Sequence, residues 1–154
     1  MTDTVRLHPE VNAIVDFLYH RFPVTVYADE VPSDFEVPAY YIPPMSTFGG
    51  NGTVSTYEKS YTLNLKLFHT KQRMAVSIAE SLHDECERER MLMPMYDQNG
   101  KPTGDYVRIK RIDVRAGDGA SAVMVFTWTS SYYYRKADYI NITDFTLEGG
   151  LKGE

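Results

Sequence analysis

A long alternation of apolar and polar residues, which begins near Tyr57, constrains the fold of this chain more than any other feature. Every second residue from Tyr61 to Leu67 is large and apolar, whereas Thr62 and Asn64 between them are polar. Because the side chains of a strand point alternately to its two faces, this period of two predicts a β-strand. One face of that strand is expected to be buried, and the other to be wet or shared.

A second stretch with the same period predicts a β-hairpin. Residues 122–129 alternate in the same way and follow a glycine-rich turn at residues 117–120. In residues 107–115, before the turn, the alternation changes phase ahead of Ile112. One extra residue in a strand, a β-bulge, would produce this change, so we predict a bulge in the first strand of the hairpin.

Two amphipathic helices are predicted beside these strands. The first begins at Pro9, a favourable first residue of a helix, and ends at Phe22 and Pro23. The second runs from about Thr70 to Glu89 and has an apolar stripe at helical spacing. The residues expected to form that buried stripe are Met74, Ala75, Ile78, Ala79 and Leu82.

The predicted fold class is α+β, with one mostly antiparallel or mixed sheet of four to five strands and both helices packed on one face. Residues 24–27 and 39–42 supply two short strands, the second between prolines that suit a sheet edge. The small and glycine-rich residues 44–56 are typical of a long, mobile loop. We interpret residues 1–134 as a single domain and residues 135–154 as a C-terminal extension or arm.

The charge balance argues against a protein that binds nucleic acid tightly. The chain has 16 Lys and Arg against 21 Asp and Glu, a formal net charge of −5, which is the wrong sign for a protein that contacts many phosphates. The longest unbroken apolar run spans only residues 122–126, so no transmembrane segment and no membrane partner are predicted. The first six residues do not resemble a secretory signal, and the simplest compartment is the cytoplasm.

The patterns that accompany common catalytic or cofactor chemistry give no support to an enzyme. Residues 49–53 lack the lysine and the spacing of a phosphate-binding loop. The polar residues 97–104, which predict no further strand or helix, begin like a calcium loop. However, Pro102 stands where that loop needs glycine and Arg108 where it needs glutamate. We therefore predict no catalytic, metal-binding or cofactor-binding residues and no cofactor.

His83 and Cys86, three residues apart on the second helix, are the nearest approach to a metal or nucleophile site. A metal would need more donors from elsewhere in the chain, and the acidic neighbours Asp84 and Glu85 oppose formation of a thiolate. The favoured interpretation is a solvated helix end with one buried thiol. Cys86 is the only cysteine, which excludes an intrachain disulfide.

The aromatic content and the polarity of the sheet favour a protein that works through its surfaces. The chain has 12 Tyr and 7 Phe, more than a small core easily hides, and tyrosine is favoured where proteins meet. The exposed face of the predicted sheet is neither charged enough for a plain solvent face nor apolar enough for a second core. A partner subunit would suit it.

Two clusters extend this interpretation. We define the basic row as Arg108, Lys110, Arg111 and Arg115, which fits cross-strand or intersubunit ion pairs better than nucleic acid. The tyrosines 132–134 fit two interpretations equally, either a filled core edge with the middle ring exposed or an interface anchor. The full set of interface candidates is Phe48, Tyr57, Thr62, Asn64, Arg108, Lys110, Arg111, Arg115, Thr127, Thr129, Tyr132, Tyr133, Tyr134, Tyr139 and Phe145.

The order of these segments resembles the tail terminator proteins of long-tailed bacteriophages over about residues 8–130. The resemblance is carried by a first helix that ends in Phe22 and Pro23 and by three segments before the second helix. These are residues 26–30 (VYADE), 37–42 (VPAYYI) and 57–65 (YEKSYTLNL). The chain departs from the family pattern in the loop 44–56 and in the extension after Tyr134.

The resemblance implies a non-enzymatic ring, usually of six subunits, at the head-proximal end of a tail. Such a ring ends tail-tube polymerisation and docks the head, and DNA passes through it without specific binding. The implied partners are other copies of the chain, the tail-tube protein and a head or neck connector. The implied location is the host cytoplasm during assembly and then the virion. Another neck or tail-tube component, or a small ligand-binding or enzymatic α+β domain, remains an alternative.

Overall fold

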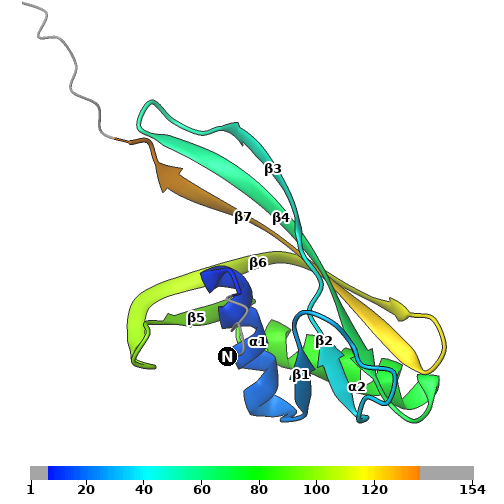
Figure 1. Ribbon diagram of the computed structural model, residues 1–154. Coiled ribbons are helices and arrows are strands. Elements are labelled where there is room, and N and C mark those ends of the chain that lie inside the picture. The colour runs from blue at the N-terminus through cyan, green and yellow to red at the C-terminus, as the bar shows by residue number, and fades with distance from the viewer. Residues whose placement is uncertain (1–6, 136–154) are drawn as a thin grey trace, which may run out of the picture.

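The computed structural model describes residues 7–135 and has two helices and seven strands in that part of the chain (Figure 1). The elements are α1 (Pro9–Arg21), β1 (Thr25–Tyr27), β2 (Ala39–Tyr41), β3 (Ser46–Asn51), β4 (Thr56–Phe68), α2 (Gln72–Arg88), β5 (Leu92–Tyr96), β6 (Pro102–Ala116) and β7 (Ser121–Tyr133). The fold is α+β, as the sequence predicts.

The sheet is mixed and larger than predicted. Its strand order is β1-β2-β4-β7-β6-β5, and β3 also pairs with β4. Only β1 and β2 pair in parallel, and the other pairs are antiparallel. The sheet therefore has seven strands instead of four to five, and the two that the sequence pattern missed are β3 and β5.

Strand β3 lies inside residues 44–56, where the sequence predicts a long loop. All six of its residues are exposed, and Gly49 and Gly50 have no side chain to pack, so no alternation could mark the strand. It forms because each residue from Ser46 to Asn51 has a partner in β4, which satisfies backbone groups that a loop would leave to water.

Strand β5 is missed for a different reason. Met93 is fully buried, but Pro94 follows it and breaks the pattern of a strand. β5 is the last strand of the sheet and pairs only with β6, and a proline is tolerated at such an edge.

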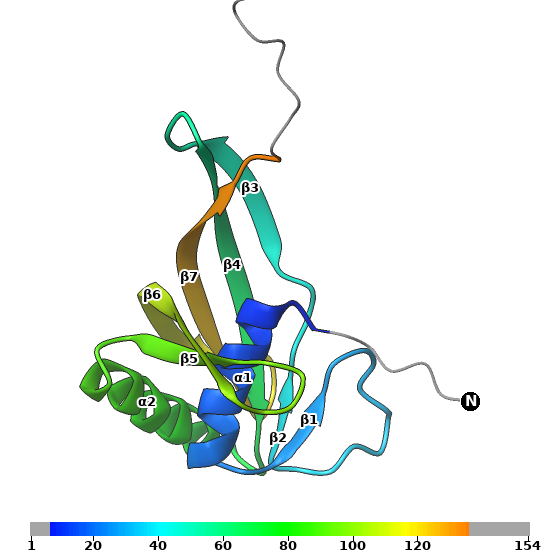
Figure 2. The same ribbon diagram turned by 90° about the vertical axis from the view of Figure 1, so that its left-hand side faces the viewer.

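Both helices cover the same face of the sheet, and the hydrophobic core lies between them and that face (Figures 1 and 2). Helix α1 starts at Pro9 and is capped at Phe22, so the predicted bounds are confirmed. The hydroxyl of Tyr40 lies 3.0 Å from the backbone oxygen of Phe22, to which it donates, and 3.3 Å from that of Leu18, so it caps the end of the helix. The largest fully buried side chains include Trp128, Tyr40, Phe126, Ile14, Leu18, Leu63, Leu65, Leu67 and Met124.

Helix α2 confirms the predicted span but shifts the buried stripe by part of a turn. Ala75, Ala79 and Leu82 are buried as expected, and Cys86 continues the stripe. Met74 is 43% exposed instead of buried, and Ile78 is half-buried. No helix within residues 7–135 is both long and apolar enough to cross a lipid bilayer.

The β-bulge predicted in the hairpin is present in β6. Ile109 is opposite Trp128, whereas Arg111 is opposite Thr127, so two residues of β6 face one step of β7. The extra residue is Lys110. It allows Ile109 before the shift and Ile112 after it to point into the core.

The distal parts of three strands extend beyond the helices as a β-sheet arm (Figure 1). We define the arm as β3 with residues 56–60 of β4 and residues 129–133 of β7. Every residue of these segments is exposed or half-buried, and α1 contacts them at their base, through Glu10. At the tip, a Cβ on Gly52 would lie 2.8 Å from the backbone oxygen of Thr56, so the tight turn there requires glycine.

Strands β2 and β3 pair with the same edge of β4. β2 pairs with residues 66–68 and β3 with residues 57–62. Between the two strands the chain passes through Pro43 and Pro44, which have no backbone N–H to donate. The edge is thus covered in two separate pieces, while the other edge of β4 pairs with β7 along all 13 residues.

Candidate assembly surface

The outer face of the sheet is the one turned away from both helices. The register of β4 and β7 places Thr62 opposite Thr127 and Asn64 opposite Val125 on this face. Near the arm, the hydroxyls of Ser60 and Thr129 lie 3.1 Å apart. Short hydroxyl and amide side chains therefore line an uncovered surface, as the alternation in the sequence predicts.

Phe48 adds an aromatic ring to this face. It lies in β3 opposite Ser60, and its side chain is 70% exposed. A large apolar ring on a polar surface is the kind of residue that anchors protein interfaces. Phe48 thus makes the arm a candidate contact site.

The basic row lies along the outward side of β6, and all four of its side chains are exposed. Nε of Arg111 donates to Oδ1 of Asp113 at 3.1 Å, an ion pair along the strand instead of across it. Within residues 7–135, no carboxylate lies within 4.0 Å of the other three cations. Most of the row therefore has its charge free for a partner.

The tyrosines 132–134 divide between the two faces of the arm. Tyr132 and Tyr134 pack on either side of Tyr57, with ring centroids 5.6 and 5.5 Å from it. Tyr133 points to the other side and is 82% exposed. The middle ring is the most exposed, but Tyr134 is also 46% exposed, so only Tyr132 packs against the edge of the core.

Glu10 joins helix α1 to the base of the arm. Its side chain is buried, at 6% exposure, and Oε1 accepts the indole N–H of Trp128 at 3.0 Å. The hydroxyls of Ser130 and Tyr132 also donate to this carboxylate. The oxygens of Tyr132 and Tyr61 lie 2.7 Å apart. Burial and then the hydrogen bond to Glu10 raise the pKa of Tyr132 well above its ordinary value.

This joint between α1 and the arm was not predicted from the sequence. In sequence, Glu10 is an ordinary acid in the first turn of a helix, where the helix dipole favours it. The sequence did contain one sign of this joint, and it lies on β7. Ser130 and Tyr132 occupy the inward-facing positions that follow Trp128, and both carry a polar hydroxyl group. Buried polar groups need partners, so these positions indicated that one was required.

The structure brings together most of the predicted interface candidates. Those on the outer face or the outward side of β6 are Phe48, Thr62, Asn64, Arg108, Lys110, Arg111, Arg115, Thr127, Thr129 and Tyr133. Tyr57, Tyr132 and Tyr134 form a separate cluster on the inner side of the arm. Tyr139 and Phe145 lie outside the described residues.

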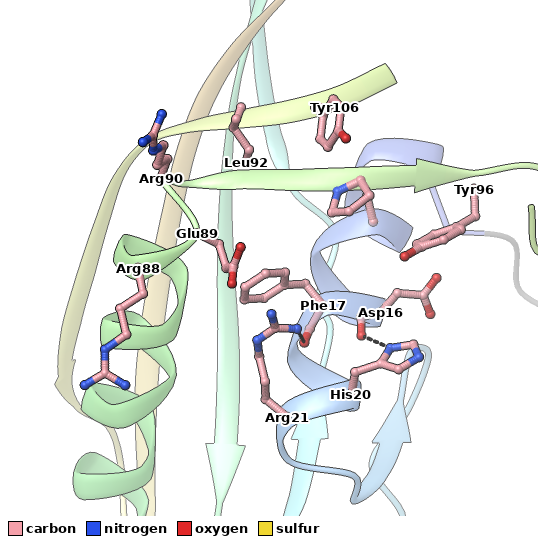
Figure 3. A pocket seen from close by; sticks show the side chains of 12 residues that line it. Asp16, Phe17, His20, Arg21, Arg88, Glu89, Arg90, Leu92, Tyr96 and Tyr106 are labelled. Atoms are coloured by element: carbon pink, nitrogen blue, oxygen red, sulfur yellow. Dashed lines mark hydrogen bonds between the residues drawn. The ribbon is translucent and has the colours of Figure 1, made fainter. Parts of the chain in front are cut away.

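A cleft of about 570 Å³ between α1, the end of α2 and β5 is the place to look for a ligand site (Figure 3). Two of its polar side chains contact the protein itself. Nδ1 of His20 donates to the backbone oxygen of Asp16 at 2.7 Å, and the Arg21 guanidinium lies 3.5 Å from the centroid of the Phe17 ring. The three groups whose pKa is raised, namely Tyr40, Cys86 and Tyr132, lie elsewhere in the described residues. The enzymatic alternative gains no support from this geometry.

Cys86 is a core residue in the described part of the chain. Its side chain is fully buried under α2, and burial raises the pKa of its thiol to about 12. The neighbouring carboxylates of Glu87 and Glu85 act in the same direction, and Arg21 acts against them. His83 instead contacts Glu87, with Nε2 3.0 Å from Oε2.

The raised pKa predicts that Cys86 makes the protein less stable in alkali. Between pH 9 and 12 the thiol ionises in the unfolded chain but not in the folded one, so the free energy of unfolding falls as pH rises. From pH 9 to 11 the wild type should lose about 2 kcal/mol more than Cys86→Ala, which has no thiol. Urea unfolding at pH 8, 9, 10 and 11 measures this. Equal pH dependence in the two proteins would contradict it.

Comparison with known proteins gives a consistent result over nearly the whole chain. The sequence model of the family described as phage tail terminator protein matches residues 11–141. In Bacillus subtilis strain 168, uncharacterized protein YqbJ is 41% identical over 146 residues, covering 95% of this chain and 100% of the relative. Phage-like element PBSX protein XkdJ of the same strain is 40% identical, with the same coverage.

Proposed function

This chain belongs to the phage tail terminator family, a family of structural tail proteins, and from that premise we propose that it closes into a ring at the head-proximal end of a phage tail. There it ends polymerisation of the tail tube and provides the surface on which the head docks. The relative XkdJ, named for a phage-like element, supports an origin in a phage or prophage.

The observation that carries the proposal is the combination of an uncovered outer face with an arm that extends beyond the core. Ring closure requires each subunit to present two different surfaces that fit each other. The outer face offers hydroxyl groups, an exposed Phe48 and exposed cations. The arm offers a second surface with the tyrosine pair Tyr57 and Tyr132, and the extension 135–154 is proposed to reach a neighbour.

The proposed partners are other copies of the chain, arranged in a ring of six, together with the tail-tube protein on one side and a head or neck connector on the other. The net charge of −5 suits a passage through which DNA slides without being held. The ring would assemble in the host cytoplasm and remain in the virion. It performs no chemical reaction and uses no cofactor.

Without this protein, the tail tube should continue to grow beyond its normal length. In a phage or prophage that carries the gene, its deletion is expected to give tail tubes of uncontrolled length with no heads attached. Electron microscopy of negatively stained particles measures both features, and expression of the wild-type chain from a plasmid should restore normal tails.

Other phenotypes would contradict the proposal in informative ways. Tubes of normal length that only lack heads would make the chain a neck completion protein. Absence of tubes would make it a tube subunit. Intact, infectious particles would remove it from tail assembly altogether.

A further inference from the structure

We propose that the basic row of one subunit docks on an acidic loop, residues 28–38, of the next copy in the ring. This inference rests on the proposed function, because it names the contact that would join neighbouring subunits. The two surfaces have opposite charge and lie on the same chain, and no ion pair joins them within residues 7–135.

The acidic loop connects β1 to β2 and carries four carboxylates and no cation. Its acids are Asp29, Glu30, Asp34 and Glu36, and all four side chains are exposed. Within residues 7–135, no cationic side chain lies within 4.0 Å of any of them. The loop thus presents a concentrated negative charge that the described part of the chain does not neutralise.

The acidic loop is held in one shape by its aromatic residue. Phe35 packs against Phe68 of β4, with ring centroids 4.8 Å apart, and against Tyr27 at 6.4 Å. The hydroxyl of Tyr27 also accepts the backbone N–H of Glu36 at 3.1 Å. A loop anchored in this way loses less conformational entropy on binding than a free one, so its carboxylates are prepared for a contact.

The basic row has the matching properties on β6. Arg108, Lys110 and Arg115 are exposed and lack a carboxylate partner within residues 7–135. The bulge contributes by placing Lys110 and Arg111 in succession opposite one step of β7, which concentrates positive charge there. The cations are also carried on a paired strand, so their spacing is fixed.

The position of the two surfaces in the sheet gives the geometry of a ring contact. The acidic loop joins β1 and β2 at one end of the strand order, and β6 lies near the other end (Figure 2). When two complementary surfaces lie on opposite sides of a subunit, each copy can bind the next one head to tail. The copies close into a ring when the rotation from one copy to the next allows it. Complementary charge then directs the approach and the register of each copy.

Because these charges are exposed, they contribute more to specificity than to affinity. One exposed ion pair changes an association constant by only about two- to fivefold, and salt weakens it. Placing like charges against each other is much more costly, so reversal of one surface should reduce assembly at least about tenfold. Charge reversal is therefore the decisive perturbation.

The test uses two triple variants in the phage deleted for the gene. The row-reversed variant carries Arg108→Glu, Lys110→Glu and Arg115→Glu, and the loop-reversed variant carries Asp29→Lys, Glu30→Lys and Asp34→Lys. Arg111 is left unchanged because it pairs with Asp113. A matched control carries Lys71→Glu, Arg73→Glu and Lys101→Glu, which reverses three exposed cations outside the basic row.

Each triple variant alone is expected to leave tubes over-length, and the two expressed together should restore normal tails. In the mixture, every reversed row can meet a reversed loop and every native row a native loop, so a ring with an even number of subunits closes with alternating copies. The matched control should terminate tubes like the wild type. Circular dichroism of the purified variants checks that each is folded.

Four results would overturn the inference. Normal tails with either triple variant alone, while the wild type also complements, would reject this contact and leave the proposed function intact. Failure of the mixture would mean that the two surfaces do not face each other. Failure of row reversal alone, with loop reversal harmless, would assign the basic row to another partner such as DNA. If the wild type itself does not end tube growth, the proposed function fails, and this contact with it.

Discussion

Replacing Trp128 with alanine is expected to lower the free energy of unfolding by about 4 kcal/mol, a large part of the roughly 5–15 kcal/mol of a typical domain. The indole is 0% exposed at the centre of the core and stacks on Tyr61 with ring centroids 5.3 Å apart. Its removal leaves a large cavity and takes one hydrogen bond from Glu10. Guanidinium unfolding followed by circular dichroism measures the change, since the chain has a single tryptophan and the variant loses its fluorescence.

Trp128→Phe is the matched control for this prediction. Phenylalanine keeps an aromatic ring against Tyr61 but has no N–H for the Glu10 carboxylate, so the expected loss is about 1–2 kcal/mol. If Trp128→Ala lost no more than Trp128→Phe, the packing of the indole would not be central to stability.

Glu10→Ala is expected to cost about 3 kcal/mol, although alanine favours a helix. The substitution leaves three donors without their acceptor, namely the indole N–H of Trp128 and the hydroxyls of Ser130 and Tyr132. Unpaired polar groups in a buried site cost more than the helix propensity returns. Denaturant unfolding gives the free energy, and hydrogen exchange of residues 56–60 and 129–133 should become faster as the base of the arm loosens.

Two control substitutions distinguish the specific role of the Glu10 carboxylate from the general effect of removing an acidic side chain from a helix. Glu10→Gln keeps an acceptor oxygen of the same reach and should cost about 1 kcal/mol. Glu80→Ala removes an exposed acid of α2 and should stay within about 0.5 kcal/mol of the wild type. Equal losses for Glu10→Ala and Glu80→Ala would show that the joint does not support the fold.

The elements with a clear period were predictable from the sequence. Both helices, the long β4 and the β6–β7 hairpin are recognisable because one face of each is apolar, and the bulge follows from the change of phase before Ile112. β3 and β5 have no such signal. The first is exposed on both faces, and the second contains Pro94. Their existence depends on pairing with β4 and β6, which is a tertiary property.

The candidate surface was predictable to a similar extent. Alternation along β4 and β7 is enough to assign Thr62, Asn64, Thr127 and Thr129 to one face, and the register of the two strands agrees. Glu10 could not be found in this way, since its partners on β7 lie about 120 positions further along the chain. The acids of the acidic loop were not among the predicted interface candidates, because neighbouring charges in a loop such as Asp29 and Glu30 are usually only solvated.

The divided edge of β4 determines where the arm is attached to the rest of the molecule. Beside the helices and again in the arm, β4 has neighbours on both edges, but at residues 63–65 only β7 accompanies it, since β2 ends before and β3 begins after the two prolines. Leu63 and Leu65 of this stretch are fully buried and face Phe126 and Met124 of β7, which are also fully buried. The gap in the edge of β4 thus lies over the packed core, and the arm extends from a base that the core holds in place.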